Sequence, residues 1–208
     1  MKKSNQIAIL IYFTLFILFP ISCIVDCGPF PVDVEVSSLK CETLIIDVDT
    51  AQNAFQYDSI YQNPVKYDRF AIIMQPQLKY LYAQQDNRMS YSFISNAMAC
   101  SEPNPPILKE HITDIQIIVN ANYDALHLAG SNVNDLFDVF VIEENHNIYQ
   151  ENISDFVSSS PLVPKYLIFK LKSPPTFSFN SSFTVNYKQN GQGLTEDSYS
   201  SESTHILP

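Results

Sequence analysis

Glycine is scarce in this chain, with only 4 residues in 208. The loops that cradle phosphate groups need several closely spaced glycines, and most of the chain cannot supply them. No serine stands in the Gly-x-Ser-x-Gly setting of a hydrolase nucleophile. The scarcity of glycine therefore counts against a phosphate-binding loop and against a nucleophile elbow.

Basic residues are also few: 12 lysines and arginines stand against 22 acidic residues, which gives a formal net charge of −10. Binding to nucleic acid, or to an anionic membrane through charge, requires basic patches. We therefore expect no nucleic-acid partner. The acidic residues are spread along the chain, and this distribution is typical of a solvated surface.

Spacings typical of metal ligands are missing as well. No two cysteines stand in Cys-x-x-Cys spacing, and the histidines form neither His-x-His nor His-Glu-x-x-His. Asp47 and Asp49 flank Val48 at the end of an expected strand, and two carboxylates there could hold calcium. No Asp-x-Asp-x-Asp-Gly loop follows, so a solvated strand end is the favoured interpretation. We expect no metal, no cofactor and no catalytic residue.

The chain does have an export signal at its start. Lys2 and Lys3 precede a thirteen-residue apolar run, Ile7–Phe19, and the small residue Ser22 stands directly before Cys23. This is the three-part layout of a secretory signal peptide. The run is short for a membrane span, which needs about twenty residues. We predict a signal peptide over residues 1–22; the alternative is an anchor retained over 7–25.

A cysteine directly after the cleavage point is typical of a bacterial lipoprotein signal, so we predict a lipidated tether over residues 23–29, with acyl chains such as palmitate on Cys23. Pro20 stands where such signals usually carry an aliphatic residue. Cys27 is therefore a second, weaker candidate for lipidation. Several acyl chains on one cysteine would anchor the protein stably.

Cys23, Cys27, Cys41 and Cys100 are the four cysteines. An exported domain lies in an oxidising space, so the three that remain after lipidation predict one disulfide and one free thiol. Two cysteines in loops bring their Cβ atoms face to face more easily than a cysteine in a strand. We therefore predict a disulfide between Cys27 and Cys100, with Cys41 buried as a small apolar residue.

Short strands dominate the expected secondary structure. Period-two alternation or compact apolar runs bounded by turn residues predict the strands. Residues 49–64 are expected to form a loop, and the proline cluster at 103–106 excludes helix and central strand there. The expected strands are Phe30–Val36, Thr43–Val48, Tyr67–Met74, Leu78–Tyr82, Ile112–Val119, Phe137–Ile142, Tyr166–Leu171, Ser182–Tyr187 and, as an edge strand, Ser203–Leu207.

One helix is expected at Tyr149–Val157, where apolar residues stand at helical spacing. The segment Gln189–Gly193 predicts a hairpin turn. Seven to nine strands with turn signals between them predict an all-β fold, an Ig-like or related β-sandwich with one short helix. After the tether, residues 30–208 are expected to form a single domain.

Two further features of the sequence are candidates for a binding or a catalytic surface. The tyrosine-rich segment Phe55–Tyr67 predicts either a binding surface or an ordinary sandwich edge, since tyrosine is enriched at interfaces. A carbohydrate-active hydrolase would need two carboxylates about 5–10 Å apart across a cleft. Its candidates would be Asp47, Asp49, Glu143 and Glu144.

The chain resembles an uncharacterised family of lipoproteins from Bacteroidota. The resemblance rests on Cys23 with Cys27 close behind, and on a series of motifs through most of the mature chain. It implies an exported, lipid-anchored, β-rich protein with no assigned activity. The motifs are Asn96–Pro106 passing into Ile112–Ile117, then His127, Gly130 and Asn134–Phe137, and finally Ser173–Phe179 and Phe183–Tyr187.

These observations predict a lipid-anchored envelope protein without enzymatic activity that binds a partner protein or a glycan. We expect it at the outer membrane. Surface lipoproteins of such bacteria often carry an acidic run just after the lipidated cysteine. Here only Asp26 is present, so the periplasmic side is favoured over the cell surface. The alternatives are the hydrolase described above and a subunit of an adhesive surface assembly built through an exposed edge strand.

Overall fold

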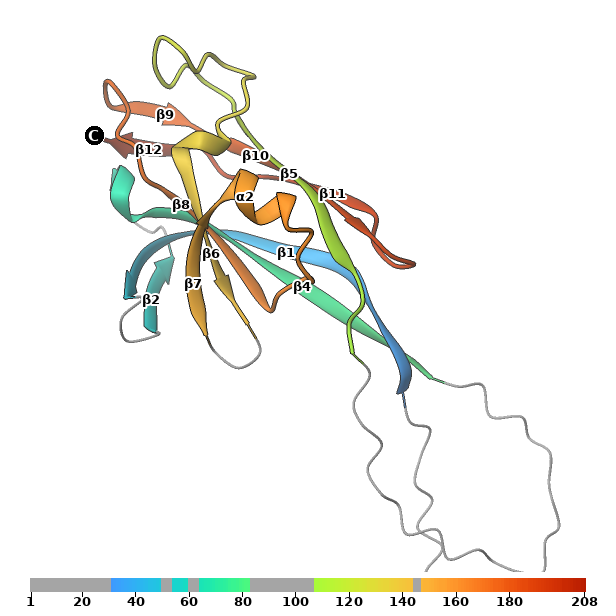
Figure 1. Ribbon diagram of the computed structural model, residues 1–208. Helices are drawn as coiled ribbons and strands as arrows, with labels where there is room; N and C mark the ends of the chain where they lie inside the picture. The colour runs from blue at the N-terminus through green and yellow to red at the C-terminus, as the bar shows by residue number, and fades with distance from the viewer. Residues whose placement is uncertain (1–30, 50–53, 60–63, 83–106, 144–146) are drawn as a thin grey trace, which may run out of the picture. The chain divides into compact units, whose positions relative to one another are not determined.

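The computed structural model describes residues 31–49, 54–59, 64–82, 107–143 and 147–208 (Figure 1). Almost all of these belong to one compact unit, formed by Asp33–Leu81 and Ile107–Pro208. The expected signal peptide and tether, with Cys23 and Cys27, and also Cys100, lie outside the described residues. Within the described ranges, no helix has the length and apolar character needed to cross a bilayer.

The all-β, sandwich-like architecture is confirmed, and the described strands form three sheets. The largest sheet has the strand order β2-β1-β4-β8-β6-β7, the second β11-β10-β5 and the third β3-β12-β9 (Figure 1). The strands are β1 Pro31–Asp49, β2 Ala54–Ser59, β3 Val65–Lys66, β4 Phe70–Tyr82, β5 His111–Val119, β6 Phe137–Ile142, β7 Ile148–Asn152, β8 Tyr166–Leu171, β9 Phe179–Ser181, β10 Phe183–Asn190, β11 Glu196–Ser200 and β12 Thr204–Leu207. The helices are η2 Tyr67–Arg69, η3 Asn134–Leu136 and α2 Ile153–Ser158.

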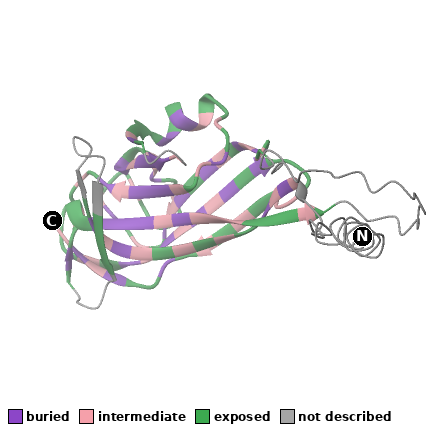
Figure 2. Cartoon of the chain, turned by 90° about the horizontal axis from the view of Figure 1, so that it is seen from below, coloured by how far each residue is buried: buried purple, intermediate pink, exposed green. Residues whose placement is uncertain are grey.

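The main core lies between the six-stranded sheet and the sheet of β5, β10 and β11. In the large sheet, Phe169 pairs with Ile72 on one side and with Val139 on the other, and all three side chains are fully buried. From the facing sheet, the ring of Phe183 lies 5.3 Å from that of Phe70 and 5.3 Å from that of Phe137. Buried and less buried residues alternate along β10, as the period of two requires, and Figure 2 shows how burial varies along the strands.

Backbone contacts also join the two sheets directly. The carboxylate of Glu110, just before β5, accepts a hydrogen bond from the backbone N–H of Val36 at 2.8 Å. The backbone N–H of Leu194, in the turn between β10 and β11, donates to the carbonyl of Val36 at 2.7 Å. Val36 on β1 is therefore held through both of its backbone polar groups by residues that flank the strands of the facing sheet.

The prediction of two separate strands near the N-terminus is wrong, because Pro31–Asp49 is one strand. Val36 faces the main core, and so do the odd-numbered Leu39 and Cys41 further along. Beyond them the even-numbered Ile46 belongs to a second apolar cluster. The parity of the core-facing residues thus changes within the strand, and this change interrupts the alternation that would have marked one long element.

The loop expected over 49–64 contains a strand, β2, which pairs antiparallel with β1 over Leu44–Asp49. The strand expected to stop before Pro76 instead continues to Tyr82. The pairing of β4 with β8 ends at Met74, so Pro76 removes no hydrogen bond from that ladder.

Two predictions near the C-terminal half are corrected. The helix expected at Tyr149–Val157 is a strand in its first part, since Tyr149 pairs with Val141 of β6, and α2 begins only at Ile153. The segment expected as an edge strand at Ser203–Leu207 forms β12, the middle strand of its sheet, between β9 and β3. The hairpin turn expected at Gln189–Gly193 does join β10 to β11, which pair antiparallel.

Candidate functional site

The six-stranded sheet is apolar on both faces. Opposite the main core, its second face carries a separate apolar cluster from β1, β4, β6, β7 and β8. A solvated outer face would carry polar side chains at these alternating positions. Ile46 and Ile168 are instead fully buried. The cluster consists of Ile46, Ala71, Phe140, Ile142, Ile148 and Ile168, with Ile73 and Tyr166 packed against it.

A pocket of about 180 Å³ opens on this second face. Tyr57 comes from β2 and Tyr166 from β8, which are three strand spacings apart, or about 14 Å in a flat sheet. Because both side chains line the same pocket, they close it from opposite sides over β1 and β4. The lining residues are Lys40, Glu42, Leu44, Tyr57, Ile73, Gln75 and Tyr166.

The polar groups of the pocket engage one another in pairs. Lys40 Nζ lies 2.7 Å from Glu42 Oε1, and this contact raises the pKa of the Lys40 ammonium. Gln75 Nε2 donates to the Tyr166 hydroxyl at 3.4 Å, and the ammonium of Lys165 lies 5.7 Å from the centre of the Tyr166 ring. The pocket therefore combines an apolar floor with a polar rim whose two lining charges cancel.

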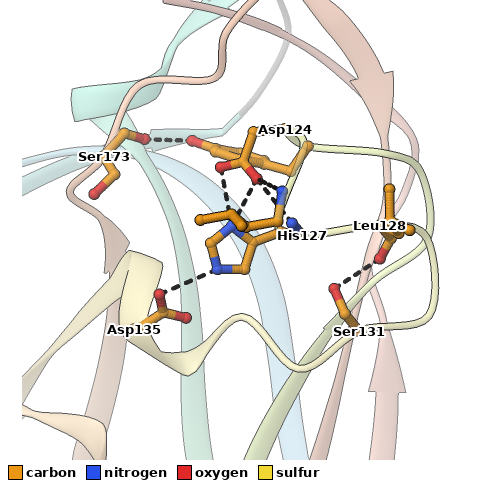
Figure 3. A network of polar contacts seen from close by, with 8 residues as sticks. Asp124, His127, Leu128, Ser131, Asp135 and Ser173 are labelled. Atoms are coloured by element: carbon orange, nitrogen blue, oxygen red, sulfur yellow. Dashed lines mark hydrogen bonds and ion pairs between the residues drawn. The ribbon is translucent and has the colours of Figure 1, made fainter.

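A second constellation surrounds His127, in the connection between β5 and β6 (Figure 3). His127 Nδ1 lies 2.9 Å from both carboxylate oxygens of Asp124, and Nε2 lies 3.1 Å from Asp135 Oδ2. The hydrogen bond to Asp124 and the charge of Asp135 raise the pKa of His127, and the hydrogen bond from the His127 side chain lowers the pKa of Asp124. Both ring nitrogens face acceptors, so the charged imidazolium fits this site best.

This arrangement fixes the loop and engages both ring nitrogens of His127. A metal ligand needs a free nitrogen lone pair, and here both nitrogens are engaged by carboxylates on opposite ring edges. In the described part of the chain, no group of three or more His, Cys, Asp or Glu is placed to hold a metal ion.

Nearby, Asn134 accepts a hydrogen bond from the N–H of Ile117 and donates one to the carbonyl of Ile115, so its side chain pairs the backbone groups at the free edge of β5. Tyr123 donates its hydroxyl proton to the carbonyl of Ser173.

The carboxylates predicted for a hydrolase have different surroundings. Asp47 is exposed on β1 and forms an ion pair with Arg69 at 2.9 Å. The backbone of Asp49 pairs with Ala54, while its side chain is not among those described. Glu143 follows β6 and is partly buried, and Glu144 lies outside the described residues. The structure thus pairs Asp47 with a cation.

Cys41 is a free thiol, as predicted, but it is half-buried where burial was predicted. Burial, with a smaller contribution from the charge of Asp197, raises the pKa of the Cys41 thiol to about 12. A thiol with such a pKa is almost wholly protonated at neutral pH, so Cys41 is a poor nucleophile. The predicted partners Cys27 and Cys100 lie outside the described residues.

Of the residues that line the pocket, only Tyr57 was indicated by the sequence as part of a binding surface. Tyr57 belongs to the tyrosine-rich segment that was weighed as a binding surface, and it is 63% exposed. Lys40, Glu42 and Leu44 alternate on β1 and therefore share a face, which was a usable signal. Gln75 and Tyr166 come from β4 and β8, and only the strand order brings them to this face.

Comparisons of this chain with protein-family models, with curated proteins and with solved structures return no match.

Proposed function

We propose that this chain is a lipid-anchored protein of the cell envelope that binds a partner protein or glycan and performs no catalysis. The export signal with Cys23 at its end supports the anchor. The observation that carries the binding role is the pocket on the second face of the six-stranded sheet, lined from β1, β2, β4 and β8. Apolar walls with a few placed polar groups are typical of binding sites.

The chemistry of the pocket supports recognition rather than turnover. Lys40 and Glu42 are paired with each other, and both side chains are about half exposed. Neither is held in the desolvated setting that tunes a general acid or base. Gln75 and the Tyr166 hydroxyl add donors and acceptors that orient a ligand.

The anchor is tested by replacing Cys23 with serine in the full-length protein. We expect Cys23→Ser to move the protein from the membrane fraction to the soluble fraction in cell fractionation. The matched control is Cys27→Ser, which should stay with the membrane. If only the Cys27→Ser variant is released, Cys27 carries the lipid. If neither variant is released, the apolar segment at 7–25 is retained as the anchor.

The non-enzymatic role is tested on a panel of glycosidase and esterase substrates. We expect no turnover above background by the purified chain. Hydrolysis that disappears in Asp47→Asn, Asp49→Asn, Glu143→Gln or Glu144→Gln would overturn this part of the proposal and support the carbohydrate-active hydrolase.

A second candidate is a subunit of an adhesive surface assembly, and the position of β11 favours it. This strand ends the order β11-β10-β5, and Glu196, Ser198 and Ser200 are exposed along it. An edge strand of this kind can pair with another chain. Crosslinking in cells should return a ladder of multimers if this candidate holds, and monomer alone would contradict it.

A further inference from the structure

We infer that the pocket between Tyr57 and Tyr166 binds an uncharged sugar residue of a glycan. This inference rests on the proposed binding function and specifies its ligand. The charge of the rim, the aromatic walls and the balance of hydrogen-bonding groups all favour such a ligand.

The charge of the pocket favours an uncharged ligand. Among the residues that the structure describes, Lys40 and Glu42 are the charged side chains that line it, and their 2.7 Å contact cancels their charges within the pocket. The chain as a whole carries a net charge of −10, so an anionic ligand approaches against long-range repulsion. A cationic ligand would have to displace Lys40 from Glu42. A neutral ligand meets neither cost.

The walls favour a ligand with an apolar face. Tyr57 and Tyr166 enclose the pocket from β2 and β8, and Leu44 and Ile73 add an aliphatic floor. Tyrosine offers a large contact area at a low cost in side-chain entropy and keeps a hydroxyl for hydrogen bonding. The C–H face of a sugar ring can lie against such a surface.

The rim favours a ligand rich in hydroxyl groups. Lys40 donates, Glu42 accepts, and the amide of Gln75 does both. A hydrocarbon chain would cover these groups without pairing them, and an unpaired buried polar group is costly. A sugar hydroxyl both donates and accepts, so adjacent hydroxyls can pair with this set while the ring covers the apolar floor.

The absence of tryptophan from the chain allows a direct test. In the full-length protein in detergent, Tyr57→Trp places a single tryptophan at the rim of the pocket. The probes are neutral tetrasaccharides of glucose, mannose, galactose and xylose, with tetragalacturonate as the anionic arm. We expect at least one neutral probe to give a saturable change in tryptophan fluorescence below about 10 mM.

Two further variants locate the binding. Tyr80→Trp, on the exposed part of β4 and outside the pocket, should give no saturable change. Adding Gln75→Ala to Tyr57→Trp should weaken the binding by about tenfold. Urea unfolding of each variant shows that the fold is kept.

Each other outcome has a defined meaning. Response to tetragalacturonate alone, or no response to any sugar, overturns the sugar assignment. A response that Gln75→Ala leaves unchanged, or that Tyr80→Trp shares, overturns the pocket as its site. None of these results removes the lipid anchor, which fails separately if Cys23→Ser leaves the protein in the membrane fraction. None removes the capacity to bind a protein either, which fails separately if a photo-crosslinker at position 57 captures no protein in cells.

Discussion

The carboxylate of Glu110 accepts a hydrogen bond from the backbone N–H of Val36 at 2.8 Å, across 74 residues of sequence. Glu110 is 5% exposed and Val36 is fully buried, so this bond lies in the interior. It connects the beginning of β1 to the segment that leads into β5. In addition, the backbone N–H of Leu194, in the β10–β11 turn, donates to the carbonyl of Val36. The two main sheets are therefore connected by polar contacts as well as by their apolar core.

The first prediction concerns this bond. Glu110→Ala removes the acceptor and leaves the buried N–H of Val36 unpaired, so it should lower the free energy of unfolding by about 2–3 kcal/mol. Glu110→Gln keeps an acceptor oxygen at the same place and should cost clearly less. Urea unfolding of the two variants measures the difference. Equal stability of Glu110→Ala and the unmodified protein would show that the hydrogen bond between Glu110 and Val36 does not stabilise the fold.

The second prediction concerns the turn that packs on Glu110. A Cβ atom at Gly193 would lie 2.4 Å from the carbonyl oxygen of Val36 and 3.1 Å from Glu110 Oε1. Gly193→Ala should therefore push β1 away from the turn and cost about 2–3 kcal/mol. The neighbouring exposed Gln192 is the control, and Gln192→Ala should change stability by no more than about 0.5 kcal/mol. Similar unfolding midpoints for both variants would refute the close packing.

The third prediction is a pH dependence set by His127. The hydrogen bond to Asp124 and the charge of Asp135 raise the pKa of His127 in the folded state. A raised pKa stabilises the fold fully below the unfolded-state value, near 6.5, and this stabilisation is lost as the pH rises through the folded-state pKa. Stability should therefore fall between mildly acidic and alkaline pH.

The measurement is urea unfolding across that pH range, with an NMR titration of the His127 ring. His127→Gln should flatten the pH dependence, and Asp135→Asn should reduce it. Asp124 acts at the acid end, because its lowered pKa adds stability that is lost as the pH falls through the folded-state value. A His127 ring that titrates at or below its unfolded-state pKa would show that the two carboxylates do not act on it.

The fourth prediction concerns Asp47. Its ion pair with Arg69 is half exposed on both sides, and such pairs contribute little to stability. Asp47→Asn and Arg69→Gln should each change the free energy of unfolding by no more than about 0.5 kcal/mol, as measured by urea unfolding. A large loss of stability in either variant would show that the pair is more than a surface contact.

The strands that could be predicted from the sequence are those whose pattern of buried residues stays the same along their length. Phe137–Ile142 and Tyr166–Leu171 were predicted with the same bounds that the structure gives. Both are compact apolar runs, because the six-stranded sheet buries both of its faces here. Ile112–Val119 differs from β5 by one residue.

The remaining elements depend on partners distant in the sequence. β2 has little apolar alternation, and its pairing with β1 makes it a strand. Tyr149 stands at helical spacing from Ile153, yet it pairs with Val141 of β6 and therefore belongs to a strand. β1 changes its core-facing parity midway, so its local pattern suggests two elements. Twelve strands in the described part exceed the seven to nine expected, because short pieces such as β3 and β9 exist only through their pairing with β12.

The site was less predictable than the fold for the same reason. Tyr57 belongs to a tyrosine-rich segment that the sequence marks as a candidate binding surface, but its counterpart Tyr166 lies in a strand predicted only as a compact apolar run. No spacing along the chain relates the two residues. Their meeting follows from the order of β2, β1, β4 and β8 in one sheet.

The lipid anchor is tested most directly by the intact mass of the full-length gene product after extraction from membranes with detergent. We predict a chain that begins at Cys23 and is heavier than the polypeptide of residues 23–208 by a diacylglyceryl group and an amide-linked acyl chain. A mass that includes residues 1–22, or a chain starting at Cys23 without lipid, would contradict it.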